Sequence, residues 1–296
     1  MKKVTHGIEH LIARVLVAFA NTLSEHGALS LGASLGAIAR LLMPSRVAIL
    51  RENLRLCRIS FDDPERQRLF VIRVFQHIGV TILEILRQNS YRRNDFDRKI
   101  SFDDLEQFNI AARTGKAVLL LSGHFGNWEL LGAYARRLGY PVDLLVKRQS
   151  DERADDLMNS LRQKQGVGVI YTDTGMRALV DAVRKRRFVA ILADQYGGAE
   201  SETVSFFGLD TLVPSGPAVL IERYSLPFMF GTMRRAKNGL HYLSAQTITN
   251  WQGRGRLEIL QAYSSMLEDA IRRSPEMWLW THRKFKNLSN YKGGAK

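Results

Sequence analysis

The chain has 296 residues, of which 45% are hydrophobic, so it can bury one large core, or one domain with an appendage. Its 43 Lys and Arg residues against 29 Asp and Glu give a formal net charge of +14. Such a charge indicates an anionic partner: nucleic acid, anionic lipid or an acidic protein. The single cysteine, Cys57, excludes an intrachain disulfide framework and suits a reducing compartment. A secretory signal is not indicated, because Glu9, His10 and Arg14 interrupt what should be its apolar core.

Residues 8–43 are apolar but interrupted by charge. Apolar residues recur there at helical spacing, first at Leu11, Val15, Phe19 and Leu23 and then, after Gly27, at Leu31, Leu35, Ile38 and Leu42. Uncharged apolar runs in this region stay below the ~18 residues that a spanning helix needs. The pattern is typical of interfacial or re-entrant membrane helices, here flanked by basic residues such as Arg14, Arg40 and Arg46. It is equally typical of an amphipathic hairpin packed on its own domain.

The rest of the chain alternates between helical and strand patterns. Residues 46–90 and 102–114 read as helical. Strands are predicted at 117–121, 142–146, 167–171, 188–193, 228–233 and 241–247, and helices at 130–138, 151–165, 175–186, 214–224 and 257–273. This alternation predicts an α/β layered domain with a mixed or parallel sheet.

The most informative stretch is 122–129, S-G-H-F-G-N-W-E, which directly follows the apolar run 117–121. It is expected at the carboxyl end of a buried strand, where open α/β sheets place their ligands. His124 lies on the turn and Glu129 in the first turn of the next helix. We expect the Glu129 carboxylate to reach one imidazole nitrogen, fix the tautomer and leave the other nitrogen as a base. The alternative is a histidine with a purely structural role.

Other polar residues follow other predicted strands or apolar runs. Arg148 comes after one strand, Asp194 and Gln195 after another, and Arg283 after the tryptophan-flanked run 278–280. A base with an orienting acid, surrounded by cations, suits attack of a hydroxyl on an acyl group of an anionic substrate. The sequence lacks a G-x-S-x-G elbow, a Walker A motif, H-E-x-x-H and paired cysteines, so we expect neither a metal nor a cofactor.

Four sequence blocks carry a resemblance to a known family. The stretch H-F-G-N-W-E at 124–129 matches the H-x4-[D/E] motif of glycerolipid-type acyltransferases. The other blocks follow in order: V-K-R at 146–148 with Asp156 and Arg162, A-D-Q at 193–195 with V-S-F-F-G at 204–208, and P-E-M-W-L-W-T-H-R-K-F-K at 275–286. Through these blocks the chain resembles, over most of its length, the bacterial lipid A biosynthesis late acyltransferases (the lauroyl and myristoyl transferases).

The resemblance implies a fold and an activity. The fold is a glycerolipid acyltransferase-like layered α/β domain with a mixed central sheet at 46–296, preceded by a helical membrane-associating segment at 1–45. The activity is transfer of a fatty acyl chain from an acyl carrier protein thioester to a hydroxyl of a lipid A precursor, without a covalent enzyme intermediate. His124 would be the general base and Glu129 its partner. The resemblance also implies substrate-binding residues, with phosphate or oxyanion contacts at Arg148, Arg162 and Arg283 and site-lining positions at Asp194 and Gln195.

The expected partners follow from the same resemblance. They are an acidic acyl carrier protein, a glycolipid acceptor and an anionic membrane surface rather than nucleic acid, at the cytoplasmic face of the inner membrane. Two alternatives stay open. One is an acyltransferase that acts on another glycolipid, such as a mannosylated phosphoinositide, or on an aminolipid. The other is a non-enzymatic, charge-driven membrane or nucleic-acid binder, which has no need of a histidine and a glutamate at a strand end.

Overall fold

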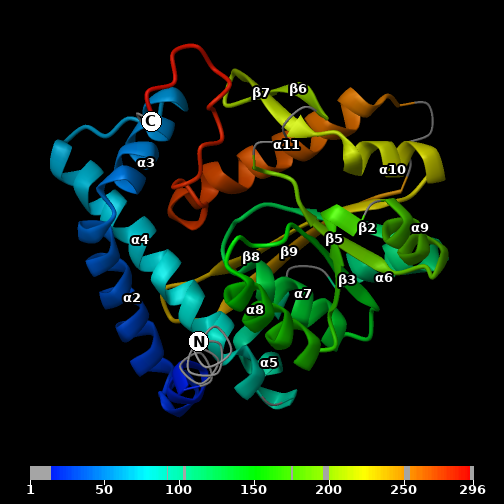
Figure 1. Cartoon of the computed structure of the whole chain (residues 1–296), viewed down its shortest axis with the longest axis horizontal. Helices are drawn as coiled ribbons and strands as arrows, with labels where there is room; N and C mark the ends of the chain where they lie inside the picture. The colour runs from blue at the N-terminus through cyan, green and yellow to red at the C-terminus, as the bar shows by residue number, and fades with distance from the viewer. Residues whose placement is uncertain are drawn as a thin grey trace, which may run out of the picture.

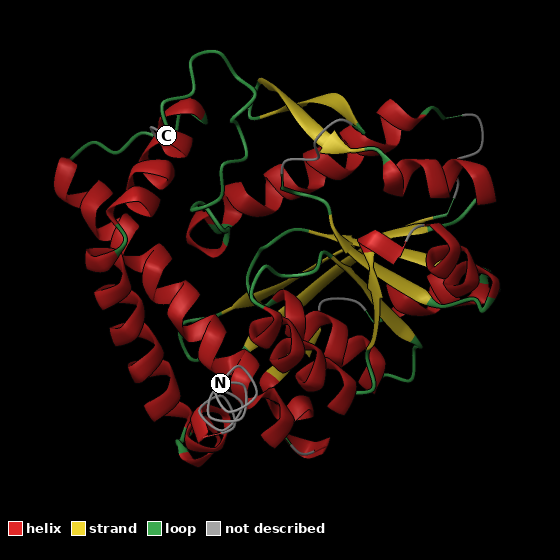
Figure 2. Ribbon diagram, in the orientation of Figure 1, coloured by secondary structure: helices red, strands yellow, loops and turns green. Residues whose placement is uncertain are grey.

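The computed structural model describes residues 15–91, 93–102, 105–174, 176–195, 200–249 and 254–293. Within them, a mixed seven-stranded sheet is flanked by helices on both faces, with a group of long helices along one side (Figures 1 and 2). The predicted α/β layered domain with a mixed central sheet is therefore confirmed. The strands are β1 (Ile100–Phe102), β2 (Val118–Ser122), β3 (Val142–Val146), β4 (Gly168–Tyr171), β5 (Phe188–Leu192), β8 (Phe228–Arg235) and β9 (His241–Ile248).

The strand order is β1-β9-β8-β2-β5-β3-β4. Five neighbouring strands, from β8 to β4, run parallel; β9 is antiparallel to β8, and β1 is parallel to β9. After β5 the chain crosses to β8, on the other side of β2. Such a change of direction opens a crevice at the carboxyl ends of the strands, and residues 123–127 lie at this point.

Strand β2 is buried on both faces, as its unbroken apolar run predicts. Leu119 and Leu121 belong to the core shared with α10 (Gly216–Tyr224) and α11 (Arg256–Arg273). Val118 and Leu120 belong to the core shared with α6 (Glu106–Arg113) and α7 (Trp128–Arg137). The helices after β1 are α6 (Glu106–Arg113), α7 (Trp128–Arg137), α8 (Glu152–Lys164), α9 (Met176–Arg184), α10 (Gly216–Tyr224) and α11 (Arg256–Arg273). Packing from both sides holds the end of β2, and with it the turn at 123–127, in one place.

A separate hairpin was not predicted. Strands β6 (Ser201–Phe206) and β7 (Leu209–Pro214) pair antiparallel through a two-residue turn at Phe207 and Gly208. Both turn residues have positive φ, +54° and +70°, as this type of turn requires. The left-handed Phe207 is supported by its backbone N–H, which donates to Glu268 of α11 at 2.6 Å. The sequence analysis treated 204–208 only as a motif, because a phenylalanine at this position is not a usual turn signal.

Three long helices precede the sheet: α2 (Glu25–Leu42), α3 (Pro44–Leu56) and α4 (Pro64–Arg87), followed by the short α5 (Arg93–Lys99). Residues 15–22 are also helical, and the part of the predicted 8–43 segment before residue 15 lies outside the described residues. The break between the two helices is at Leu23 and Ser24 and not at Gly27. The Ser24 side chain accepts the Gly27 N–H at 3.0 Å and caps α2.

Helix α2 packs along α4 through glycine (Figure 1). A Cβ at Gly36 would lie 2.1 Å from the Phe75 carbonyl oxygen, and one at Gly79 would lie 2.2 Å from the Gly32 carbonyl oxygen. The two backbones are therefore in direct contact. The larger apolar side chains of α2 point outward, and the most exposed are Leu35, Ile38, Leu41 and Leu42, at 46–76%. The apolar stripe of α2 is thus not the face that packs on the protein itself.

Among the described residues, one helical run, Pro64–Ser90, is long and apolar enough to cross a membrane, and 61% of its apolar window is buried inside the protein. Helices α2 and α3 meet the same criterion only as a pair, which is bent by 94°. A buried core helix passes this test as readily as a spanning one. Helix length and composition alone therefore do not identify a spanning segment among the described residues.

We expect Gly36→Ala to destabilise the protein by about 1–3 kcal/mol, because the new methyl group meets backbone atoms that have no alternative rotamer. The matched control is Gly216→Ala at the start of α10, where a Cβ meets nothing within 4 Å. Chemical unfolding of the three proteins measures the difference. Equal stability of Gly36→Ala and wild type would contradict the close packing of α2 on α4.

Candidate active site

His124 lies on the turn after β2 and is held by Asp194, which follows β5. Its Nδ1 is 2.8 Å from Asp194 Oδ1, and its backbone N–H donates to Asp194 Oδ2 at 2.9 Å. The imidazole is 20% exposed and the carboxylate 3%. Because a carboxylate accepts, the Nδ1–H tautomer is the one that this contact selects, and Nε2 is left as the basic nitrogen.

The Asp194 carboxylate has a third donor, the indole Nε1 of Trp278, at 2.8 Å. Burial disfavours the charged carboxylate. The charge of the His124 ring and the hydrogen bonds from His124 and Trp278 outweigh that effect and lower the pKa of Asp194 to about 2. Asp194 is therefore ionised throughout the physiological range. A Cβ at Gly123 would lie 3.2 Å from Asp194 Oδ2, so a residue without a side chain permits this close approach.

The expectation that Glu129 contacts the His124 imidazole is wrong. Glu129 is buried, and its carboxylate forms a two-pronged ion pair with Arg162 of α8, at 3.0 Å to Nε and 2.6 Å to Nη2. Successive side chains of a helix are separated by about 100°, so α7 directs Trp128 and Glu129 to different sides. The Trp128 ring lies 5.1 Å from the imidazole, edge to face, and Glu129 points away from it.

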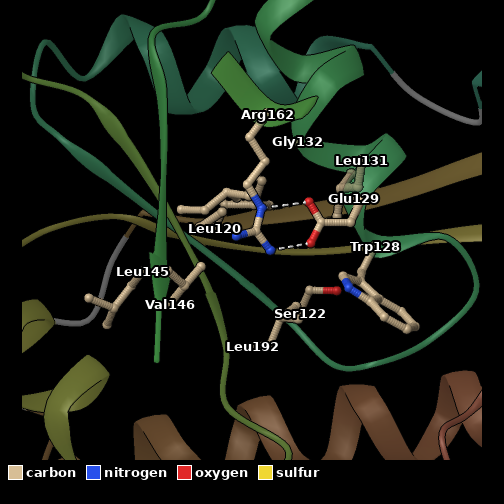
Figure 3. Close-up of a pocket in the computed structure, with 12 residues that line it drawn as sticks. Leu120, Ser122, Trp128, Glu129, Leu131, Gly132, Leu145, Val146, Arg162 and Leu192 are labelled. Atoms are coloured by element: carbon tan, nitrogen blue, oxygen red, sulfur yellow. Dashed lines mark hydrogen bonds and ion pairs between the residues drawn. The ribbon is translucent and has the colours of Figure 1, made fainter. Parts of the chain in front are cut away.

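The Glu129–Arg162 pair forms part of the wall of a pocket that is otherwise mainly apolar (Figure 3). The pocket opens to solvent. It is lined from β2, β3, β5, α7 and α8 by Leu120, Ser122, Trp128, Glu129, Leu131, Gly132, Leu144, Leu145, Val146, Arg162, Ala190 and Leu192. Ser122 and Trp128 connect this pocket to His124, since one precedes the histidine by two residues and the other packs on its ring.

Three of the five N–H groups of Arg162 are bound to protein partners. Besides Glu129, its Nη1 donates to Asn159 Oδ1 at 2.9 Å. Burial lowers the pKa of the guanidinium, but the hydrogen bond and charge of Glu129 prevail, so the pKa is raised overall and the guanidinium remains ionised. A substrate phosphate at Arg162 would have to compete with the Glu129 carboxylate.

The other predicted binding residues lie at different places. Gln195 is at the site, with its Nε2 3.3 Å from His124 Nε2. Arg148 is exposed beyond β3; it stacks on Tyr171, 3.8 Å from the ring centroid, and donates to Asp173 at 2.9 Å. Arg283 is also exposed, whereas its neighbour Lys284 is buried and donates to the Leu212 carbonyl at 2.9 Å. Burial lowers the pKa of Lys284 to about 8.

The backbone at 277–279 holds the turn after β2, a role that the sequence did not indicate. The Gly126 N–H donates to the Met277 carbonyl and the Leu279 N–H to the His124 carbonyl, both at 2.9 Å. Helix α3 holds the continuation of this segment, since Asn53 Nδ2 donates to the Trp280 and His282 carbonyls at 2.7 and 2.8 Å. The W-L-W-T-H-R pattern belongs to a block typical of the family. Backbone pairing between residues more than 150 positions apart, however, has no signature in the local sequence.

An α/β fold with a carboxylate-held histidine at the end of its central strand has the arrangement of an acid–base enzyme. The chain belongs to the bacterial lipid A biosynthesis acyltransferase family, whose model matches residues 3–287. The resemblance inferred from the four sequence blocks is therefore confirmed, and the family makes the chain an acyltransferase.

Three relatives illustrate this similarity. A lipid A biosynthesis palmitoleoyltransferase from Escherichia coli (strain K12) is 23% identical, over 86% of this chain and 84% of that protein. A lipid A biosynthesis lauroyltransferase from the same organism is 22% identical over the same shares. A phosphatidylinositol mannoside acyltransferase from Mycobacterium tuberculosis (strain CDC 1551 / Oshkosh) is 26% identical over 39% of this chain and 38% of that protein.

An experiment can distinguish the roles of the Asp194 and Glu129 carboxylates. We expect Asp194→Asn to change the tautomer of the His124 ring, because the carboxamide can donate to Nδ1 instead of accepting from it. Glu129→Gln should leave the tautomer as in wild type, because Glu129 is paired with Arg162. The measurement is ¹⁵N NMR of histidine-labelled protein, with His124 assigned by substitution. A changed ring signal in Glu129→Gln but not in Asp194→Asn would reverse the assignment.

Proposed function

We propose that this protein transfers a fatty acyl chain from an acyl carrier protein thioester to a hydroxyl group of a lipid A precursor. The observation that carries this proposal is the His124 imidazole, held at Nδ1 by buried Asp194 and adjoining a mainly apolar pocket, in a chain of the lipid A acyltransferase family. This constellation does not suit a purely charge-driven binder, which needs cations on a surface and no oriented base.

The acyl chain of the donor occupies the apolar pocket. The leucines, Val146 and Ala190 of the wall suit a hydrocarbon (Figure 3). The thioester is then placed near Ser122 and Trp128, the lining residues that adjoin His124. The Glu129–Arg162 pair positions the pocket wall and holds a guanidinium near the reacting carbonyl. Two N–H groups of Arg162 are not accounted for by Glu129 and Asn159, and they suit stabilisation of the developing oxyanion.

The reaction proceeds by direct attack. Nε2 of His124 removes the proton of the acceptor hydroxyl as its oxygen attacks the thioester carbonyl carbon. Asp194 stabilises the imidazolium that forms. The carbon–sulfur bond then breaks, the new ester is released, and the proton on Nε2 passes to the departing thiolate of the carrier's prosthetic arm. His124 is the catalytic base and Asp194 its positioning partner.

The substrates fit the charge of the chain. A net charge of +14 favours an acidic carrier protein and a phosphorylated glycolipid, and exposed Arg148 and Arg283 are candidates for contacts with these anions. A second acceptor class, another glycolipid, is supported by the similarity to the mycobacterial phosphatidylinositol mannoside acyltransferase, which covers 39% of the chain. Mass spectrometry of the glycolipids of cells with and without the protein distinguishes the two acceptors.

The acceptor is reached at an anionic membrane, which we propose is the cytoplasmic face of the inner membrane. The exposed apolar face of α2 lies next to exposed cations of α3, Arg46 and Arg51. Such a surface gains both apolar burial and electrostatic attraction at a lipid headgroup layer. Helix α3 also holds the segment at 280–282 beside the site, so lipid-bound helices keep the site close to the bilayer.

We expect His124→Ala to lower acyl transfer by at least about 100-fold, because the lipid hydroxyl then loses its base. The control is His26→Ala, which removes an exposed imidazole of α2 and should retain activity. The assay follows a labelled acyl chain from the carrier protein to a glycolipid, alongside a thermal melt. Near-normal transfer in a folded His124→Ala protein would disprove the general-base role.

We expect the triple variant Leu35→Gln, Ile38→Gln and Leu42→Gln to lose at least about tenfold in binding to anionic liposomes, because these exposed side chains would otherwise be buried in the lipid interface. The matched control replaces three exposed apolar residues elsewhere, Leu105, Ile110 and Leu257, with Gln. Co-sedimentation with phosphatidylglycerol vesicles measures the difference. Equal losses in both triple variants would mean that α2 has no special part in membrane binding.

A further inference from the structure

A second buried polar cluster lies on the other side of the turn that carries His124. It joins helix α4 to strands β8 and β9, and each member is at most 8% exposed. We call it the α4–β8 cluster, and it consists of His77, Thr81, Glu84, Arg235 and His241. The three α4 residues are spaced i, i+4 and i+7, so they lie on one face of the helix, toward the sheet.

The centre of the cluster is an ion pair between Glu84 and Arg235. The guanidinium Nε donates to Glu84 Oε1 at 2.7 Å, and Nη2 donates to Oε2 at 2.5 Å. The Arg235 guanidinium also contacts His77 Nδ1 through Nη1 and Thr81 Oγ1 through Nη2, both at 2.9 Å. The charges of Arg235 and His241 lower the pKa of Glu84 against the opposing effect of burial, so the pair is ionised.

Stability alone is a weak explanation for this cluster. Desolvation of two charges is expensive, and well-packed apolar residues often stabilise a core as well as or better than a buried ion pair. What apolar residues cannot supply is an acceptor of fixed position and direction. The cluster supplies such an acceptor to Asn127, three residues after His124: Asn127 Nδ2 donates to Glu84 Oε2 at 2.9 Å.

Asn127 has two contacts that face in different directions. Its Nδ2 is bound to Glu84, while its Oδ1 accepts the Leu130 N–H at 3.1 Å and caps helix α7. The backbone N–H of Asn127 also donates to the Met233 carbonyl of β8, at 2.9 Å. Burial and the Arg235 charge lower the pKa of His77 to about 3, so this ring is neutral. The contact with Glu84 of α4 therefore holds the end of the turn, and the contact with Asp194 holds its start.

We propose that Glu84 and Asn127 are positioning residues for His124, and that the α4–β8 cluster fixes the turn at the distance from Asp194 that the reaction requires. The inference rests on the proposed function. The turn is held at Asp194, at residues 277–279 and at Asn127. Loss of the Asn127 side-chain contact leaves the far end of the turn with backbone contacts only, from the Asn127 N–H to the Met233 carbonyl and from the Gly126 N–H to the Met277 carbonyl, both at 2.9 Å. A shift of about 1 Å at a reacting group costs about 100-fold in rate.

The test uses Asn127→Ser in the full chain. Serine is as good a helix cap as asparagine, so α7 keeps its first turn, but serine is too short to reach Glu84. We expect kcat for acyl transfer to fall about 10- to 100-fold while KM stays within about twofold, because the substrate pocket is not altered. The limb of the pH–kcat/KM profile that reports the base should also move, since the contact between His124 and Asp194 changes.

The matched control is Asp143→Asn, which breaks a partly buried carboxylate–guanidinium pair with Arg187 at the amino-terminal edge of the sheet. It should lower the melting temperature and leave kcat and the pH profile unchanged. A second measurement needs no substrate: the ¹⁵N signal of the His124 ring should differ from wild type in Asn127→Ser and not in Asp143→Asn.

The outcomes are distinct. Wild-type kcat and a wild-type ring signal in Asn127→Ser would overturn the positioning role while leaving the proposed function intact. A loss of kcat of equal size in both variants, in step with their melting temperatures, would mean general destabilisation and would also overturn it. An inactive wild-type protein would reject the proposed function itself, and the ring signal would then show separately whether the cluster orients His124.

Discussion

The carboxylate of Asp194 is the contact on which the site depends, because three distant parts of the chain meet there. The ring and backbone N–H of His124 come from the end of β2, the carboxylate follows β5, and the Trp278 indole comes from the C-terminal segment. A buried charge is tolerated only when donors replace its lost hydration, and here three donors do so. Loss of the charge would remove the common partner of all three.

Two further buried carboxylates lie around residues 124–129, and each has its own guanidinium. Glu129 is paired with Arg162 in the pocket wall, and Glu84 is paired with Arg235 behind the turn. The pairing keeps like charges from competing for the imidazole, so one carboxylate, Asp194, acts on His124. The three carboxylates have separate contacts: Asp194 binds the His124 ring, Glu129 lies in the pocket wall, and Glu84 binds the Asn127 side chain.

The helices before the sheet connect this site to the exterior. The glycines of α2 allow its backbone to contact the backbone of α4 directly. The larger apolar side chains of α2 therefore lie at the surface. Helix α3 in turn binds the carbonyls of Trp280 and His282 through Asn53. An apolar, cation-flanked surface and the turn that carries His124 are thereby linked through packed helices, which suits the proposed action on a lipid.

Patterns that extend over a few residues were readable from the sequence. The apolar run at 117–121 defined the central strand, the alternation after it predicted the α/β fold, and four short blocks indicated the family. His124 was located correctly at a strand end. These inferences succeeded because burial and helical or strand periodicity are properties of local sequence.

Only the tertiary structure determined which side chains contact one another. Glu129 is five residues from His124 and Asp194 is seventy, yet Asp194 holds the ring, because β5 pairs with β2 and α7 turns Glu129 toward Arg162. The same holds for Trp278, for Asn127 with Glu84, and for the outward leucines of α2. Each depends on which elements become neighbours, and that is determined by the packing of the whole chain and not by any one stretch of it.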